Sequence, residues 1–396
     1  MRNVASFFLS LSVVKAGAVI LQLLMVLSVN LNMAQSSSGK YLWLYSLFFV
    51  LSAFSRLGQD LLILKAGEGN RDGSYSVVII SSVLFSILSF FISYAYTTDI
   101  YASLCTALAL MFNSIIVHRA HFLQCSGRYY LQVLSNNFLT NLLFCSIIFF
   151  IDFITEAWHA MLLYVFSQIS SMLFISIYHK SLYITETLSF DLGLIVKGRY
   201  FCALSVTSFL INWFPPILVG VLLGDAMVSV VVILLRFGMV AAFPLVVVNS
   251  FFAGKLKNIK GGVLESFYFF KIVNKLSFSV SFIAVMIMTF SVDILFRNMA
   301  IEPIYKAMFF LIMLASFVNS LTGPVALYLN MLGEEKRVFL FSCLSFIIMV
   351  IVILILSESY SNYSVGIAIL CQSIVSNIPL YLILLRKFRI AKVGSF

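Results

Sequence analysis

Uninterrupted apolar runs of about 20 residues recur along the whole chain, and they constrain its fold more than any other feature. In a bilayer every backbone polar group must be satisfied within the chain, so only helices and closed barrels can span it. A barrel would show alternating apolar and polar residues instead of solid apolar runs. Only 10% of the residues are charged, whereas soluble proteins are about a quarter charged. The sequence therefore excludes a soluble enzyme and predicts an all-α integral membrane protein.

Twelve runs are long enough to span a bilayer. They cover residues 12–33, 41–64, 75–97, 101–123, 131–151, 160–180, 200–222, 226–249, 273–296, 304–329, 338–356 and 363–385. We expect two pseudo-symmetric six-helix lobes, with an N-lobe over residues 1–180 and a C-lobe with a basic tail over 200–396. The semi-polar stretch 181–199 between them is expected to be an interfacial linker on the cytoplasmic surface.

The basic side chains are divided unevenly between the two sides that twelve spans would create. With both termini inside, nineteen of the 25 Lys and Arg residues fall in cytoplasmic segments and three on the opposite side. Lys and Arg in short loops favour the cytoplasm. We therefore expect both termini to be cytoplasmic. The net charge of +10 then reflects orientation and anionic lipid, and we expect no nucleic acid as partner.

Once the basic residues assigned to the two sides are set apart, three cations remain in the expected spans, namely Lys15, Arg56 and Arg236. A charge at the bilayer centre costs about 2.5–3.5 kcal/mol, so it usually faces a polar cavity or a partner. Arg236 has no acidic residue three or four positions away, and we expect it to bind an anion. Asp60 lies one helical turn after Arg56, which leaves open an anion ligand or an ion pair there. Lys15 lies near the start of its span, where snorkelling to the interface is the alternative.

Prolines form a second group of candidate functional residues. All six lie in the second half of the chain, and a proline inside a span removes a backbone hydrogen bond and bends the helix. We expect bends at Pro215, Pro216, Pro244 and Pro324. Such bends either take part in gating or only improve packing.

Patterns typical of other chemistries are missing from the sequence. There is no GxxxxGK[ST] phosphate loop and no CxxC pair among the six cysteines. His118 and His121 have no third ligand at the spacing of a metal site, so we interpret them as interfacial side chains. We expect no enzyme, no metal and no cofactor. The driving force would be a proton gradient, a sodium gradient or the membrane potential.

One motif resembles that of a known family. The stretch 322–336 reads TGPVALYLNMLGEEK and is similar to the signature at the tenth span of polysaccharide flippases in the multidrug/oligosaccharidyl-lipid/polysaccharide (MOP) exporter superfamily. Weaker similarities follow at Gly58 to Leu64 and from Pro244 through Asn249 to Lys255. The layout of twelve spans in two lobes covers essentially the whole chain.

This resemblance implies a Wzx-type flippase that moves an undecaprenyl-diphosphate-linked oligosaccharide unit, of the O-antigen or capsule type, between the leaflets of a bacterial inner membrane. It implies that spans 1, 2, 7 and 8 line a central cavity, which would place Lys15, Arg56 and Arg236 around the diphosphate and Asp60 beside them as an ion-pair or coupling residue. A glycan polymerase and a chain-length regulator would be further partners. The chain lacks the two extra spans of lipid II flippases.

Two other functions stay open. A cation-coupled multidrug exporter of the same superfamily would use a buried carboxylate, and Asp60 is the one acidic residue that approaches membrane depth. A membrane-embedded glycan polymerase or acyltransferase is disfavoured, because such enzymes need a sizeable outer loop and the outer loops here are short.

Overall fold

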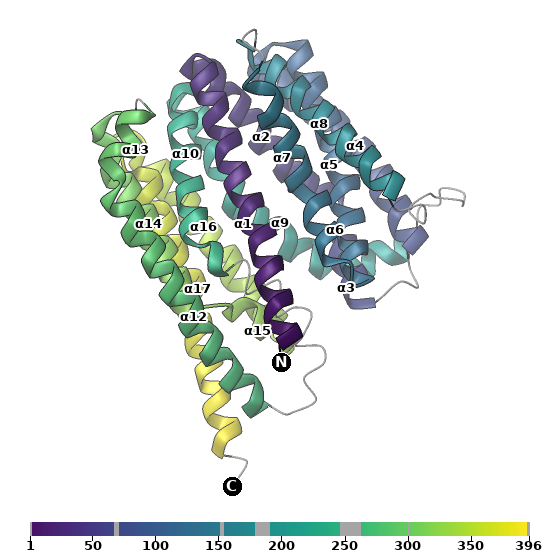
Figure 1. Cartoon of the computed structure of the whole chain (residues 1–396), viewed down its shortest axis with the longest axis vertical. Coiled ribbons are helices and arrows are strands. Elements are labelled where there is room, and N and C mark those ends of the chain that lie inside the picture. The colour runs from purple at the N-terminus through teal and green to yellow at the C-terminus, as the bar shows by residue number, and fades with distance from the viewer. Residues whose placement is uncertain are drawn as a thin grey trace. The chain divides into compact units, whose positions relative to one another are not determined.

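The computed structural model describes residues 2–66, 71–150, 154–178, 191–245, 263–299 and 301–393. Over these ranges the chain forms helices joined by short turns, without a strand (Figure 1). Nine of the described helices are long and apolar enough to cross a membrane. The expected all-α membrane fold is thus confirmed, and the described part of each of the twelve expected spans lies in one helix or in consecutive helical pieces.

The chain divides into two compact units. We call Val13–Val232 the N-terminal unit and Ile233–Phe396, together with Met1–Ser12, the C-terminal unit. The helices of the first part of the chain are α1 (Arg2–Asn32), α2 (Gln35–Ser55), α3 (Gln59–Ala66), α4 (Arg71–Thr97), α5 (Ile100–Cys125), α6 (Tyr129–Val133), a π-helical turn (Leu134–Phe138), α7 (Leu139–Ile148), α8 (Ala157–Tyr178), α9 (Leu192–Leu223) and α10 (Asp225–Ala241).

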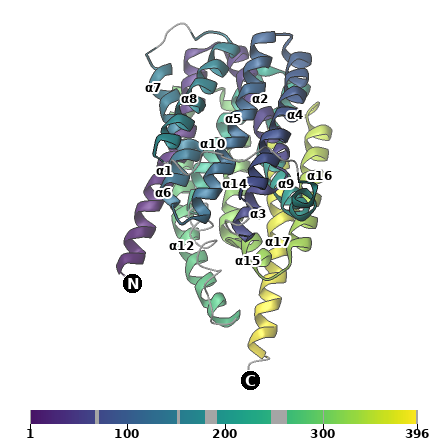
Figure 2. The same cartoon turned by 90° about the vertical axis from the view of Figure 1, so that its right-hand side faces the viewer.

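The N-terminal unit is built around α2 and α5. Helix α5 packs on α4 and α8, whereas α2 packs on α9, α4 and α5 (Figures 1 and 2). Local signals set the helix ends: the Asp99 carboxylate accepts hydrogen bonds from two backbone N–H groups of the first turn of α5, and Asp191 caps α9 in the same way. These caps satisfy N–H groups that a helix start leaves without partners.

Helix α9 belongs to the N-terminal unit. The Trp43 indole N–H donates to the Ile217 carbonyl at 3.0 Å, and the Trp213 ring stacks on Phe49 at 4.5 Å between centroids. Residues 192–199 of the expected linker are the first two turns of this helix, and residues 181–190 lie outside the described residues. The expected lobe boundary therefore stays a prediction, while the compact N-terminal unit extends to Val232.

The C-terminal unit centres on the last helix. Its elements after α10 are α12 (Val263–Phe290), α13 (Val292–Asn298), a 3-10 turn (Pro303–Tyr305), α14 (Lys306–Thr322), α15 (Val325–Met331), α16 (Glu335–Leu356) and α17 (Ser364–Val393). Helix α17 packs on α12, α14, α15 and α16 (Figure 2). The second half of α10 packs on α14, where the Ser316 hydroxyl donates to the Gly238 carbonyl at 3.0 Å.

The motif of residues 322–336 forms the two turns on either side of α15. Gly323 ends α14 and Gly333 follows α15, both with positive φ. Glu334 then binds two cations, with Arg337 Nε at 3.2 Å and Lys387 Nζ of α17 at 2.5 Å. The hydrogen bond from Lys387 holds the pKa of Glu334 below its ordinary value. The motif therefore ties the start of α16 to the end of α17.

This pKa shift predicts an acid-dependent loss of stability. Because the carboxylate is favoured in the folded state, its contribution is present above its unfolded pKa and is lost as the pH falls through the folded pKa. We expect the melting temperature of Glu334→Gln to fall less than that of the wild type when the pH is lowered from neutral to below about 4. Glu302→Gln, at an exposed residue, is the control. Parallel pH profiles of wild type and Glu334→Gln would contradict the role of this pair.

Candidate functional site

A break between α2 and α3 positions the first candidate residues. Residues 56–58 separate the helices, and Leu57 and Gly58 have left-handed φ values of 48° and 72°. The backbone of α9 lies directly against this break, since a Cβ added to Gly58 would be 2.3 Å from the backbone nitrogen of Cys202 and 2.5 Å from the carbonyl oxygen of Gly198. Only a residue without a side chain fits here.

Arg56 and Asp60 form a buried ion pair on either side of this break. Arg56 Nε lies 3.0 Å from Asp60 Oδ2, and the two residues are 0% and 3% exposed. Arg56 Nη1 donates to the Ser52 hydroxyl at 3.1 Å, and its guanidinium carbon lies 5.0 Å from the centre of the Phe209 ring of α9. Of the two interpretations left open by the sequence, the ion pair is the one present in this structure. Anion binding by Arg56 stays a prediction.

One donor of Arg56 is not used. Its Nη2 atom is buried and has no hydrogen-bond partner among the described residues. Small polar groups continue from the Ser52 hydroxyl that Nη1 contacts: Asn113 Nδ2 donates to this hydroxyl at 2.9 Å, and the hydroxyls of Ser55 and Ser114 are 2.6 Å apart. A buried donor without an acceptor is costly. An incoming oxygen ligand that reached Nη2 would remove this cost.

Two histidines lie on α5, which packs on α3. His118 is only 2% exposed, and its ring lies 5.9 Å from that of Tyr75. His121 is half-buried, with Nδ1 2.8 Å from the Val117 carbonyl. His118 is thus covered by protein, with Tyr75 of α4 beside it, and its expected place at the membrane interface stays a prediction. Among the described residues no group of three His, Cys, Asp or Glu could hold a metal ion.

The other two interior cations lie on different helices. Lys15 is half-buried on α1 and belongs to the N-terminal unit. Arg236 lies on α10 within the C-terminal unit. It is 3% exposed, and its Nη1 atom lies 2.6 Å from the sulfur of Met239. Arg236 is therefore buried within the protein, and anion binding by Arg236 stays a prediction.

The four prolines differ in their positions. Pro215 and Pro216 are buried within α9, which continues through both of them. Pro244 comes after α10, whose last residue is Ala241. Pro324 is the residue that precedes α15, directly after the turn at Gly323. Pro244 and Pro324 thus lie where helices end, as expected for a residue without a backbone N–H, and gating by any of the four stays a prediction.

Sequence comparison adds no relative. No protein-family model matches the chain, and no curated protein sequence matches it.

Solved structures match almost the whole chain. A MATE transporter in complex with MaD5 has a TM-score of 0.68 at 13% identity, over 97% of this chain and 96% of the other. The MATE multidrug transporter DinF-BH has a TM-score of 0.66 at 14% identity, over 96% and 95%. A MOP superfamily transporter from Pyrococcus furiosus, described by a reversed polarity of its binding pocket that suggests a different function, has a TM-score of 0.63 at 12% identity, over 97% and 96%.

These matches define the class of the fold. The chain has the fold of the MATE transporters, which are described as members of the MOP superfamily. At such low identity the likeness concerns the fold, so the cargo has to be argued from the residues of this chain.

Proposed function

We propose that this protein is a Wzx-type flippase, which moves an undecaprenyl-diphosphate-linked oligosaccharide from the cytoplasmic to the periplasmic leaflet of a bacterial inner membrane by alternating access. The observation that carries the proposal is the sign of the buried charge. Among the described residues two arginines, Arg56 and Arg236, are buried, against one carboxylate, Asp60. An interior with excess positive charge suits an anionic cargo.

The arginines suit a diphosphate for a chemical reason. A guanidinium presents several N–H donors in a planar fork, which can grip phosphate oxygens in pairs. In the proposed role Arg236, the Nη2 group of Arg56 and Lys15 contact the diphosphate, while the glycan occupies water-filled space. With the cell interior negative, each negative charge moved outward gains about 2.3 kcal/mol per 100 mV, so the membrane potential favours export.

A second candidate function is a cation-coupled multidrug exporter. It is supported by the fold shared with the multidrug transporter DinF-BH and by the burial of Asp60. In this function a proton or sodium ion at Asp60 would compete with Arg56 for the carboxylate. The pocket polarity noted for the Pyrococcus furiosus transporter indicates that cargo chemistry is not fixed by this fold.

Replacing Arg236 by alanine tests the first function. We expect a 10- to 100-fold loss of flipping, since one charge-assisted hydrogen-bonding group contributes about 1.5–3 kcal/mol. The measurement uses proteoliposomes that contain a fluorescent polyprenyl-diphosphate-linked saccharide, with a membrane-impermeant quencher reporting its leaflet. Arg297→Ala removes an exposed arginine of α13 and should leave the rate unchanged.

The same vesicles distinguish the two functions. A flippase moves the diphosphate-linked saccharide and gives no accumulation of a cationic dye when a proton or sodium gradient is imposed. An exporter gives gradient-driven dye accumulation and no saccharide movement. A normal flipping rate in a correctly folded Arg236→Ala protein would contradict the role of Arg236, and absence of flipping by the wild type would contradict the flippase itself.

A further inference from the structure

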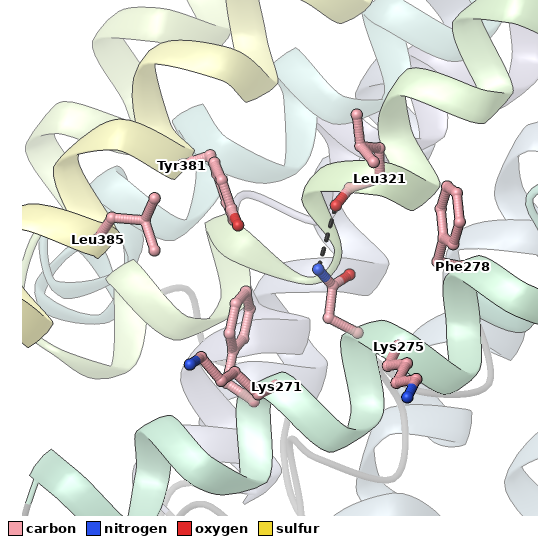
Figure 3. Close-up of a pocket in the computed structure, with 8 residues that line it drawn as sticks. Lys271, Lys275, Phe278, Leu321, Tyr381 and Leu385 are labelled. Carbon is pink, nitrogen blue, oxygen red and sulfur yellow. Dashed lines mark hydrogen bonds between the residues drawn. The ribbon is translucent and has the colours of Figure 1, made fainter.

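A pocket of about 260 Å³ lies within the C-terminal unit, where α12, α14 and α17 pack together. Lys271, Asn274 and Lys275 of α12 and Tyr381 of α17 supply its polar side chains, and Phe278 and Leu321 contribute to its apolar walls. In Figure 3 the Tyr381 hydroxyl points from α17 toward α12. Three helices therefore contribute to one cavity, and none of the residues proposed to contact the cargo lines it.

The pocket has a fixed frame. Asn274 Nδ2 donates to the Leu321 carbonyl at 3.1 Å and so joins α12 to the last turn of α14 (Figure 3). The Phe270 side chain is 2% exposed and packs edge-on against Tyr328 at 4.9 Å between ring centres. These contacts hold α12 against α14 and α15, so a ligand would meet a largely preformed site.

The charge of the pocket is positive. Lys271 and Lys275 lie one helical turn apart on α12, and both are exposed. No acidic side chain occurs among the described residues that line the cavity. Two ammonium groups and a phenol hydroxyl offer donors to a compact anion with several oxygens, such as a phosphate group.

The surroundings of the pocket are apolar. The apolar stretch of α12 begins at Phe270, so both lysines lie where this helix enters its membrane-spanning part. Exposed apolar side chains of α12 include Ile272, which lies between the two lysines, and Val280 and Ile283, which lie beyond them. Lysine stems at such a place lie along apolar surface with the ammonium at the interface. A ligand here meets both a cationic end and a hydrocarbon-like surface.

We propose that this pocket binds the headgroup of an anionic glycerophospholipid. The phosphate lies between the Lys271 and Lys275 ammonium groups and accepts a hydrogen bond from the Tyr381 hydroxyl, while an acyl chain runs along α12. A soluble phosphate would satisfy the lysines but not the apolar surface beside them. The site lies in the C-terminal unit alone and does not depend on the identity of the transported cargo.

Native mass spectrometry of the full-length protein in neutral detergent tests the proposal. The probes are dioctanoyl phosphatidylglycerol, dioctanoyl phosphatidylcholine and inorganic phosphate. We expect the wild type to bind one phosphatidylglycerol more tightly than phosphatidylcholine. Each lysine near an anionic lipid contributes about fivefold in affinity, so Lys271→Gln with Lys275→Gln should weaken phosphatidylglycerol binding roughly 25-fold. Tyr381→Phe should give a smaller loss.

The control removes the same charge elsewhere. Lys336 and Arg389 are exposed basic residues of α16 and α17, and Lys336→Gln with Arg389→Gln should keep wild-type affinity. Wild-type melting temperatures in both double variants would show that the fold is retained. Lys275→Gln alone should weaken phosphatidylglycerol binding about fivefold, which provides a second measurement. Unchanged lipid affinity in the pocket variants, or displacement of phosphatidylglycerol by equimolar inorganic phosphate, would overturn the proposal.

Discussion

Replacing Asp60 by alanine should destabilise the protein by about 3–5 kcal/mol, because it leaves the guanidinium of Arg56 buried without its counter-charge. Arg56 is 0% exposed, so the uncompensated cation cannot reach water without opening the break between α2 and α3. The expected fall in melting temperature is roughly 6–20 °C. Thermal unfolding in detergent, followed by tryptophan fluorescence, measures it.

A double variant separates charge from packing. Arg56→Met with Asp60→Leu replaces the ion pair by apolar side chains of similar size, and such replacements are often neutral or stabilising. We expect the double variant to recover most of the lost melting temperature. A double variant as unstable as Asp60→Ala would show that the loss does not come from the unpaired charge. If the stable double variant still flips cargo, Arg56 is not a diphosphate ligand and Asp60 is not a coupling residue.

The apolar runs were sufficient to predict the fold class and the approximate positions of the nine described helices that are long and apolar enough to cross a membrane. Hydrophobicity determines which segments lie in the bilayer, and this information is local. The sequence did not predict every helix break within the expected spans. Gly58 was part of a weak motif similarity, yet only the close approach of α9 shows why the span of residues 41–64 must break there. Such an approach joins residues about 140 positions apart, and no periodicity reports it.

The candidate site was predictable only where its contacts are local in the sequence. The spacing of Arg56 and Asp60 indicated an ion pair, since residues four apart share a helix face. The contact of Arg56 with Phe209 of α9, in contrast, depends on tertiary packing and has no local signal. The burial of His118 was also not predictable, because the sequence places it near a helix end but does not show its contact with Tyr75 of α4.

The sequence also does not show which distant residues line the lysine pocket together. Lys271 and Lys275 were counted only among the cytoplasmic charges that set orientation. Tyr381 lies more than 100 residues later, and no motif connects it with them. Their meeting in one cavity follows from the packing of α12 and α17. Sequence could have indicated two lysines one turn apart at the start of an apolar helix, which is a weak signal for a lipid headgroup.

Gly58→Ala should give the second large effect, with a loss of about 2–5 kcal/mol. Part of this is the cost of a left-handed backbone for a residue with a side chain, about 1–2 kcal/mol. The remainder is overpacking of about 1–3 kcal/mol, because the added Cβ would meet the Cys202 backbone nitrogen at 2.3 Å. Backbone atoms of a helix cannot move aside as a flexible side chain can. The melting temperature of the detergent-purified variant measures the loss.

Gly127→Ala separates the two contributions. Gly127 has a φ of 78°, close to that of Gly58, but no atom of the described residues, apart from Gly127 and its chain neighbours, lies within 4 Å of the position of an added Cβ. This variant should therefore lose only the stability that the left-handed backbone costs. The difference in the free energy of unfolding between the two variants measures the contact of the break with α9. Equal losses would show that α9 can withdraw at little cost, and the break would then not fix the position of Arg56 in the way the structure indicates. A larger loss for Gly58→Ala would show that the close contact of α9 with the break between α2 and α3 stabilises the fold. The same contact then also fixes the position of Arg56.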